Sequence, residues 1–401
     1  MADETLIFEG LKVLDVSSWI AAPAAATMLA TRGADVLKVE VPVLGDGYRN
    51  YAELAFTPNA DINYTWTLDN RHKRSLTLNL KTDEGQEIMH RLIRECDVFI
   101  TNQPLQLRRD LKLTYDDIHH LNDRMIYGSL TPYGEVGPDR DKEAFDLVAY
   151  WNRSGLMDKM RPPGSEPVQA LAGMGDHPTA VALYASIVTA LLQRERTGKG
   201  TKVHTSLLAN GVWSASCLAQ ARLGEADFSP VPDRQRLTAA LYQAADGRWM
   251  QLNMVRTAEV FDLMLVAMDA VHLLADERFA TLEDRALHAE ELTAIMRELF
   301  AARTSEEWLQ LLAVDHGLPV ERVATFDDLP TDEHLTLNGI VSPAMHDVGM
   351  AQVINDPVNV EGVTKKPAGH APTMGQHSDE VLRELGYDEA TIARLRADGI
   401  I

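Results

Sequence analysis

The stretch Leu11-Lys-Val-Leu-Asp-Val16, followed by Ala21-Ala-Pro-Ala-Ala-Ala-Thr-Met-Leu-Ala-Thr-Arg32 and then Ala34-Asp-Val-Leu-Lys-Val-Glu40, decides the fold. The first and third runs are short, apolar and flanked by turn residues, so each predicts a buried strand. The middle run predicts a helix that ends at Gly33. A strand, a helix, a glycine and a second strand within about 30 residues indicate a βαβ unit of a doubly wound parallel sheet.

The turn after the first strand argues against a dinucleotide site. Such a site needs G-x-G-x-x-G there, because the glycines let the backbone approach the pyrophosphate. This turn reads Ser17-Ser-Trp-Ile-Ala-Ala-Pro23 and holds no glycine. We therefore predict an α/β, Rossmann-like fold without NAD binding.

The strand and helix patterns continue along the chain. Strands are predicted at 74–80, 97–101, 125–130 and 202–207, and the long helices at 84–95 and 178–196. The residue composition changes near residue 225, and Pro230 and Pro232 indicate a linker there. A hairpin around Asp246-Gly247 and helices up to about residue 329 then predict a smaller α+β domain.

Composition limits the classes of function. The 401 residues carry a net charge of −21, which argues against binding to nucleic acid or to an anionic membrane. The two cysteines, Cys96 and Cys217, suggest neither a disulfide framework nor a thiolate metal site. The start lacks a signal-peptide pattern and no long apolar run occurs, so we expect a cytoplasmic protein with no membrane span.

The stretch Leu171-Ala-Gly-Met-Gly-Asp-His-Pro-Thr-Ala-Val-Ala-Leu-Tyr184 places Asp176 between two glycines and a long helix. Asp176 is either an ordinary helix-start residue or an exposed nucleophile. Pro178 favours the first helical position, which would make His177 the cap. In both interpretations the helix start favours an ionised carboxylate. Gly173 and Gly175 permit close approach of a ligand and could turn N–H groups toward an oxyanion.

Several other polar residues have two interpretations each. The run Asn70-Arg-His-Lys-Arg74 is a solvated basic run or a phosphate clamp through Lys73 and Arg74. Arg108 and Arg109 form a second such pair, and Lys142 is most simply a surface residue.

Asp146 is most simply a helix cap, or else a carboxylate that orients substrate or tunes Asp176. The histidines lack a metal-ligand spacing, so we expect structural or surface roles for them and no metal site; they include His119, His120, His177 and His204.

Five motifs in this order and spacing resemble one family. They are the opening 11–40, Asn70-Arg-His-Lys-Arg-Ser75, Tyr133-Gly-Glu-Val-Gly-Pro138, Gly175-Asp176 with Glu195-Arg-Thr-Gly-Lys-Gly200, and Gly375-Gln-His-Ser-Asp379. Together they are similar to the family III CoA-transferases, the CaiB/BaiF superfamily that includes formyl-CoA transferase.

The resemblance implies a Rossmann-like large domain built from both chain ends, with an inserted smaller α+β domain, and an interlocked, ring-like homodimer. We accordingly expect residues 1–225 and 331–401 in the large domain and 226–330 in the small one. It also implies Asp176 as the nucleophile that attacks an acyl-CoA thioester, with a small carboxylic acid as acceptor. Coenzyme A enters as acyl-CoA co-substrate, and no tightly bound cofactor is expected.

The resemblance also suggests binding residues. Candidates near the acyl group are Gly173, Gly175, Asp146 and Trp19. Candidates for CoA are Lys73, Arg74, Asn102, Arg108, Arg109 and Lys142.

The chain departs from the family pattern at two places. Relatives often read Asn-Phe-Arg-Pro-Gly where this chain has Asn102-Gln-Pro-Leu-Gln106. Racemases of the superfamily carry Gly-His-Asp where this chain has Ala144-Phe145-Asp146, so transfer is favoured. A 2-methylacyl-CoA racemase, an intramolecular CoA-transferase and a CoA-ester-binding protein without turnover remain alternatives.

Overall fold

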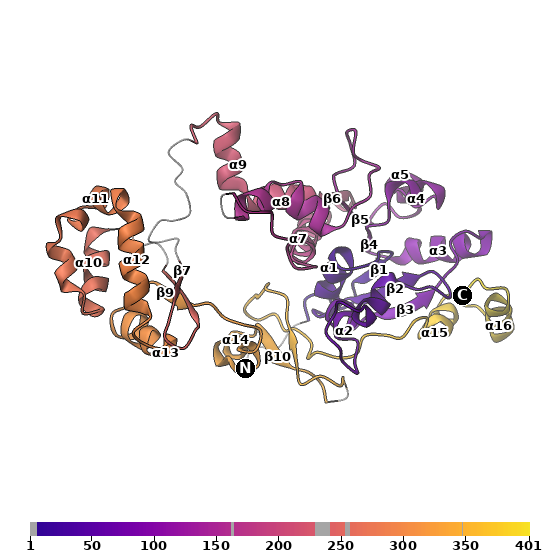
Figure 1. The fold of residues 1–401 in the computed structure, drawn as a ribbon. Coiled ribbons are helices and arrows are strands. Elements are labelled where there is room, and N and C mark those ends of the chain that lie inside the picture. Colours follow the sequence, from indigo (N-terminus) through magenta and orange to yellow (C-terminus); the bar gives the residue numbers. More distant parts are fainter. Residues whose placement is uncertain (1–5, 162–163, 229–240, 253–256, 347) are drawn as a thin grey trace. The chain divides into compact units, whose positions relative to one another are not determined.

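The computed structural model describes residues 6–161, 164–228, 241–252, 257–346 and 348–401 (Figure 1). By its internal contacts the chain forms two compact units. One consists of Met1–Met160, Pro167–Gln220 and Glu333–Ile401, and the other of Arg161–Glu166 and Ala221–Asp332. The predicted domain borders at 225/226 and 330/331 stay predictions, because compactness alone does not show that a segment folds as a domain.

The first unit is built on a six-stranded sheet with the strand order β3-β2-β1-β4-β5-β6. All neighbouring strands pair in parallel. The strands are β1 (Lys12–Asp15), β2 (Asp35–Glu40), β3 (Arg74–Thr77), β4 (Val98–Thr101), β5 (Ile126–Thr131) and β6 (Lys202–Ser206). The predicted doubly wound parallel sheet is thereby confirmed, and the strand order reverses between β1 and β4.

Helices cover both faces of this sheet (Figure 1). The helices of this unit are α1 (Ala21–Ala30), α2 (Tyr64–Asn70), α3 (Asp83–Glu95), α4 (Leu105–Asp110), α5 (Tyr115–Ile118), α6 (Leu156–Met160), α7 (Asp176–Thr197), α8 (Leu207–Ser214), α14 (Glu333–Leu337), α15 (Ser378–Glu384) and α16 (Glu389–Ala397). Helix α9 (Ser216–Leu223) contains the border between the two units. Shorter turns are η1 (Gly47–Glu53), η2 (His119–Leu121) and the π-helix η3 (Leu147–Asn152). A small antiparallel pair joins β10 (Val341–Pro343) to β11 (Gln352–Ile354).

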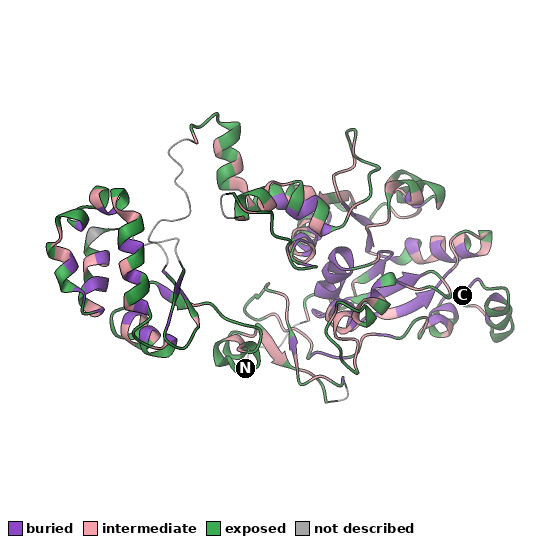
Figure 2. Cartoon of the chain, viewed as in Figure 1, coloured by how far each residue is buried: buried purple, intermediate pink, exposed green. Residues whose placement is uncertain are grey.

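Two apolar cores explain this layering. Side chains alternate along each strand, so Val13 faces a core shared with α1 and α7 while Leu14 faces one shared with α3, α15 and α16. Every residue of α1 is buried, as Figure 2 shows in purple. The small alanine side chains of α1 let α7 pack closely against it.

The end of the chain is anchored beside β3. The backbone N–H of Asn79 donates to the carbonyl of Ile400 at 2.7 Å. The N–H of Thr77 donates to Ser378 Oγ at 3.2 Å. Residues from both ends of the sequence therefore share one core.

The second unit holds the antiparallel sheet β7-β8-β9, made of β7 (Leu241–Gln243), β8 (Trp249–Leu252) and β9 (Val320–Arg322). Its helices are α10 (Ala258–Ala267), α11 (Leu282–Leu287), α12 (Ala289–Phe300) and α13 (Ser305–Trp308), with shorter turns at η4 (Val271–Ala275), η5 (Glu277–Phe279), η6 (Leu309–Asp315) and η7 (Leu329–Thr331). The predicted hairpin around Asp246-Gly247 is confirmed, and Gly247 has the positive φ that its turn requires. The predicted linker prolines, Pro230 and Pro232, lie outside the described residues.

The start of α7 differs from the prediction. The helix begins at Asp176, two residues before the predicted start at Pro178, and its N-cap is Gly175, so neither Asp176 nor His177 caps it. Pro178 is the third helical residue, where its missing N–H is tolerated because the first four N–H groups of a helix have no partner inside it. The helix ends at Thr197, and its C-cap Gly198, with a φ of 75°, confirms the predicted glycine stop. Among the described helices, none combines the length and the apolar character needed to cross a membrane.

Candidate active site

A cavity of about 300 Å³ opens at the carboxyl ends of β1 and β4. Its walls come from the loops after these strands, from the loop 140–145 and from the start of α7. In open parallel sheets the crevice at the reversal of strand order is the usual ligand site. The sheet and the cavity therefore point to the same place.

Asp176 is the first residue of α7, and its carboxylate lines this cavity. The side chain is half-buried, and within the described part of the chain no hydrogen bond to it is found. A carboxylate that faces a cavity without a structural partner is free to contact a ligand. This placement differs from that of a helix-capping aspartate, whose oxygens accept backbone N–H groups.

The two glycines before Asp176 are needed for different reasons, Gly175 for close packing and Gly173 for its backbone conformation. A Cβ on Gly175 would lie 2.6 Å from Tyr150 Cγ and 3.0 Å from Asp146 Cβ. The N–H of Gly175 donates to Asp146 Oδ2 at 3.1 Å. This donor, which we predicted for an oxyanion, is therefore occupied. Gly173 has a φ of 82°, a backbone conformation that glycine adopts without strain.

Asp146 lies buried beside this turn and has a capping role as well. Its Oδ1 accepts from the N–H of Leu147 at 2.8 Å, at the start of η3. Burial, and next the negative charge of Asp146, raise the pKa of Asp176 well above 3.8. A helix start stabilises a carboxylate by about 0.3–1 kcal/mol, which is less than one pKa unit. Burial and repulsion therefore outweigh the helix start in setting the pKa of Asp176.

Trp19 forms another wall of the cavity, and its backbone has an unusual φ of 68°. Its indole contacts the ring of Phe145, with ring centres 5.2 Å apart. The backbone N–H of Trp19 donates to Asp46 Oδ1 at 3.0 Å. A Cβ on Gly47 would lie 3.1 Å from the indole, so this glycine leaves room for the ring.

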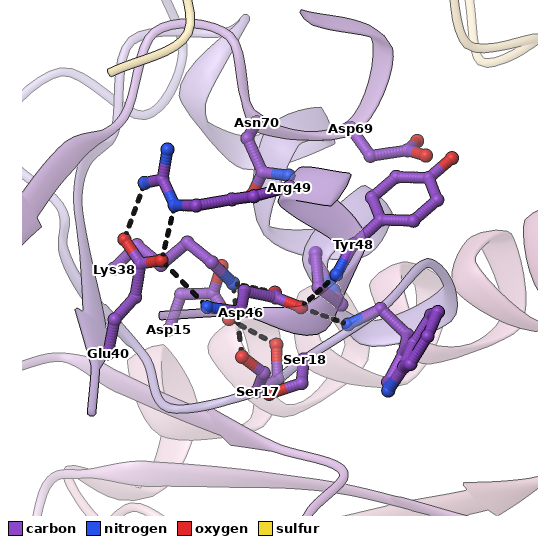
Figure 3. A network of polar contacts seen from close by, with 12 residues as sticks. Asp15, Ser17, Ser18, Lys38, Glu40, Asp46, Tyr48, Arg49, Asp69 and Asn70 are labelled. Carbon is purple, nitrogen blue, oxygen red and sulfur yellow. Dashed lines mark hydrogen bonds and ion pairs between the residues drawn. The ribbon is translucent and has the colours of Figure 1, made fainter. Parts of the chain in front are cut away.

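A buried polar network holds the turn that carries Trp19 (Figure 3). Lys38 Nζ lies 2.9 Å from Asp46 Oδ2, and both side chains are at most 1% exposed. The same ammonium donates to the carbonyl of Ser17 at 3.0 Å. The cavity wall is therefore fixed by ion pairs beneath it.

Lys73 belongs to this network and not to the cavity. Its ammonium donates to Asp15 Oδ2 and the Pro23 carbonyl at 2.8 Å, and to the Asp69 carbonyl and Asn70 Oδ1 at 2.9 Å. Four acceptors surround three N–H bonds. The predicted CoA contact of Lys73 therefore has no support in this arrangement. Burial, only partly offset by Asp15, lowers the pKa of Lys73 to about 8.

Arg74 lies at the end of the strands opposite to the cavity, because it is the first residue of β3. Its guanidinium pairs with Asp35 at 2.7 Å, Glu384 at 2.9 Å and Glu380 at 3.1 Å. The cavity lies where the strands end, so the structure separates Arg74 from Asp176. The phosphate contact predicted for Arg74 conflicts with this position.

The two arginines of the second predicted basic pair, Arg108 and Arg109, have different surroundings. Arg108 is buried and donates to Ser129 Oγ at 2.6 Å, to the Leu130 carbonyl at 2.8 Å and to the Gln103 carbonyl at 2.6 Å. Arg109 is exposed and pairs with Asp141 at 2.6 Å. Arg108 therefore supports the loop after β4, whereas Arg109 stays accessible.

Two of the predicted CoA contacts do line the cavity. Asn102 lies there and bonds to both the N–H and the carbonyl of Ser18, at 2.9 and 2.7 Å. Lys142 lies at the cavity together with Arg140, which the sequence analysis missed. Arg140 precedes Lys142 by two residues in one polar loop, and this proximity was the available signal.

A second cavity, of about 580 Å³, opens at the carboxyl ends of β1, β2, β3 and β4. Ser18 and Gln103 line both cavities. The second cavity contains the exposed Lys81, another residue that the sequence analysis did not select.

A pair of residues next to Asp176 was also missed. His177 Nε2 lies 3.1 Å from Asp69 Oδ1, although 108 residues separate them in sequence. The sequence analysis treated His177 as structural, and no local spacing pointed to Asp69. The topology of α2 and α7 brings them together.

Comparisons with known proteins agree with this geometry. Residues 8–378 match the model of CoA-transferase family III. The chain is 33% identical to the (R)-2-hydroxy-4-methylpentanoate CoA-transferase of Clostridioides difficile, over 99% of this chain and 100% of that protein. It is 28% identical to the cinnamoyl-CoA:phenyllactate CoA-transferase of Clostridium sporogenes, over 99% and 98%.

Solved structures show the same relationship. A CaiB/BaiF family protein from Brucella suis superimposes with a TM-score of 0.81 at 25% identity, covering 96% of this chain and 100% of that one. The motifs at the start, the middle and the end of the sequence are thus parts of one shared fold. The chain belongs to CoA-transferase family III and is an enzyme of that family.

Proposed function

We propose that this enzyme moves CoA from an acyl-CoA thioester to a carboxylic acid, with Asp176 as the nucleophile. The observation that carries the proposal is the Asp176 carboxylate, which faces the cavity at the reversal point of the sheet and accepts no hydrogen bond from the residues that the structure describes. A carboxylate attacks a thioester without a separate base once it is ionised. Family membership supplies the thioester as the substrate class.

The proposed reaction has four steps. The Asp176 carboxylate attacks the thioester carbonyl, the C–S bond breaks, and a mixed anhydride and the CoA thiolate result. The thiolate then attacks the aspartyl carbonyl, which releases the donor acid and leaves an aspartyl-CoA thioester. The acceptor carboxylate attacks this thioester and forms a second anhydride with release of the thiolate. The thiolate finally attacks the acceptor acyl carbon and restores the Asp176 carboxylate.

The cations at the cavities suit the phosphates of CoA. Arg140 and Lys142 at the first cavity and Lys81 at the second are exposed and sit at the ends of the strands. Charged donors of this kind bind phosphate strongly. We propose these three for the CoA phosphates, with Asn102 and Arg109 as neighbouring contacts.

The acyl group is proposed to lie between Trp19 and Asp176, next to the turn that holds Gly173. The indole supplies an apolar wall, and the positive φ of Gly173 shapes that turn. Asp146 acts through Asp176, since it bonds to the turn at Gly175 and raises the pKa of the nucleophile.

Phe145 favours transfer over racemisation. It lines the cavity with Asp176, at the place where the resemblance puts the racemase histidine. A phenyl ring neither accepts nor donates a proton, so the second base of a two-base racemase is missing there. An intramolecular CoA shift within one dicarboxylic acid uses the same Asp176 chemistry and is separated from intermolecular transfer by experiment.

We also propose a homodimer. Exposed large apolar side chains occur on two consecutive helices of the first unit, at Leu192 of α7 and Trp213 of α8. Such side chains commonly mark protein–protein contacts. Sedimentation velocity of the purified chain is expected to give twice the mass of 44.4 kDa, and a monomer at micromolar concentration would refute it.

The test of the chemistry uses a panel of donors and acceptors drawn from the relatives. Succinyl-CoA, cinnamoyl-CoA and 2-hydroxy-4-methylpentanoyl-CoA serve as donors, with phenyllactate, glutarate and 2-hydroxy-4-methylpentanoate as acceptors. With donor alone, mass spectrometry is expected to find CoA on the peptide that contains Asp176, and hydroxylamine should convert it to a hydroxamate. Isotope-labelled acceptor recovered as its CoA ester identifies intermolecular transfer.

Asp176→Ala should lose both the adduct and the turnover. Asp116→Asn, which changes an exposed carboxylate on α5, is the control and should keep both. An active Asp176→Ala enzyme without any adduct in the wild type would overturn the proposal. Deuterium entering the α-carbon in the absence of an acceptor acid would instead support the racemase alternative.

A further inference from the structure

A histidine–carboxylate pair lies directly beside the proposed nucleophile. His177 Nε2 lies 3.1 Å from Asp69 Oδ1, and His177 Nδ1 lies 3.2 Å from the carbonyl oxygen of Gly173. A carbonyl and a carboxylate accept hydrogen bonds and cannot donate them. Both contacts are satisfied together when both ring nitrogens carry protons, which is the imidazolium form.

The position of Asp69 favours this charge. Its side chain is almost fully buried near the end of α2, and its second oxygen accepts no hydrogen bond in the described part of the chain. In Figure 3 the hydroxyl of Tyr48 points toward this carboxylate. A buried carboxylate needs a compensating positive charge, because removal from water is otherwise costly. His177 supplies such a charge at hydrogen-bond distance, and the charges of Lys73 and Arg71 also act on Asp69.

Negative and positive groups both act on the Asp176 carboxylate. Asp146 and Asp69 raise the pKa of Asp176, whereas His177 lowers it. The phenols of Tyr48 and Tyr51 also face this group, and they are neutral at physiological pH. Of these described neighbours, His177 is the one that carries positive charge.

We propose that His177, held in its charged form by Asp69, is a positioning residue that favours the ionised form of the Asp176 carboxylate against burial and against the repulsion of Asp146. The inference rests on the proposed function, because it assigns a role toward a nucleophilic Asp176. His177 acts by charge and does not donate to substrate, since both of its N–H groups are occupied.

The charge of His177 is measurable without any substrate. Although burial lowers it, the hydrogen bond and the charge of Asp69 raise the pKa of His177 to about 9. Histidine NMR of the full chain, with the His177 signals assigned by their loss in His177→Gln, should show an imidazolium at pH 7. Asp69→Asn should move its titration down toward the ordinary value near 6.5. A neutral His177 at pH 7 in the wild type overturns the inference.

The effect on the nucleophile is measured by single-turnover labelling of Asp176 with the panel acyl-CoA that labels the wild type fastest. An opposite charge at contact distance lowers a carboxyl pKa by about 1–3 units, and one unit is tenfold in the ionised fraction. His177→Gln should therefore shift the acid limb of the labelling rate to higher pH and slow labelling there by about tenfold or more. Above the shifted limb the variant should approach the wild-type rate.

A second substitution separates charge from structure. In the His177→Gln chain the Asp69 carboxylate stays unpaired and repels Asp176. Adding Asp69→Asn removes this repulsion, so the double variant should label faster than His177→Gln alone on the acid limb. His119→Gln, at an exposed histidine that begins η2, should leave the profile unchanged.

The outcomes separate the two proposals. If no panel donor labels the wild type at Asp176, the proposed function fails, while the NMR experiment still decides whether His177 is charged. Two results would overturn the inference when the wild type is labelled, because both would make the role of His177 structural. One is that His177→Gln slows labelling equally at every pH. The other is that adding Asp69→Asn to His177→Gln does not restore the labelling rate on the acid limb.

Discussion

The salt bridge between Lys38 and Asp46 is predicted to stabilise the fold far more than a surface pair of identical length. Lys38 Nζ lies 2.9 Å from Asp46 Oδ2, with both side chains at most 1% exposed. Lys12 Nζ also lies 2.9 Å from its partner, Glu95 Oε2, but these side chains are 54% and 61% exposed. The two pairs differ mainly in burial, so Lys38→Met and Lys12→Met form a matched comparison.

The magnitude follows from what each substitution leaves behind. After Lys38→Met, Asp15 keeps the ammonium of Lys73 at 2.8 Å, whereas Asp46 loses its one ion pair in the described chain. An uncompensated buried charge destabilises by about 3–5 kcal/mol. Lys12→Met leaves Glu95 in water, where a pair of this kind contributes about 0–1 kcal/mol. Methionine has a similar length to lysine, so lost packing adds little in either case.

Urea unfolding of the full chain measures both effects. Because the chain has two compact units, the transition of the first unit is followed by hydrogen exchange of β1 and β2 amides rather than by a global signal. We expect Lys38→Met to lower the free energy of unfolding of the first unit by about 3–5 kcal/mol, and Lys12→Met to lower it by less than about 1 kcal/mol. Equal losses in the two variants would refute the argument that burial decides the strength of the pair.

Three further predictions concern the site. Gly175→Ala should destabilise the first unit by about 1–3 kcal/mol and slow the labelling of Asp176, because the added methyl group would lie 2.6 Å from Tyr150 Cγ. Unfolding experiments and single-turnover assays measure the two effects. Arg74→Gln should leave the KM for acyl-CoA unchanged, whereas Lys142→Gln should raise it several-fold; steady-state kinetics with CoA esters decide between them. Since the pKa of Asp176 is raised, labelling should already fall as pH drops through the range above 3.8, and a flat rate down to pH 4 would contradict this.

The sequence predicted the sheet well because its signals are local. The strands at 11–16 and 34–40 need only short apolar runs and a glycine stop, and each lies within one or two residues of β1 and β2. The length of α7 was likewise readable from periodicity and from Gly198. Such patterns depend on neighbours in the chain, so they can be recognised without knowledge of the tertiary structure.

The basic residues were predicted poorly because their partners are distant in sequence. Lys73 and Arg74 are adjacent and chemically similar, yet one is enclosed by Asp15 and the other pairs with Glu384 across 310 residues. Consecutive residues at the start of a strand point to opposite sides, and no local pattern tells which side meets an acid. A charge run in sequence therefore gives no information on which cation remains free for a ligand.

The environment of Asp176 reconciles two opposing needs of the proposed reaction. A fully solvated aspartate is ionised at neutral pH, but its hydration shell must be removed before it attacks a carbonyl carbon. Burial beside Asp146 removes part of that shell and, by the same physics, raises the pKa of Asp176. The opposite charge of His177 limits that rise without filling the cavity, because its ring donates away from it, to Asp69 and Gly173. A local cation beside a partly buried carboxylate therefore serves the nucleophile better than exposure to water would, and the pH profile of His177→Gln measures how much.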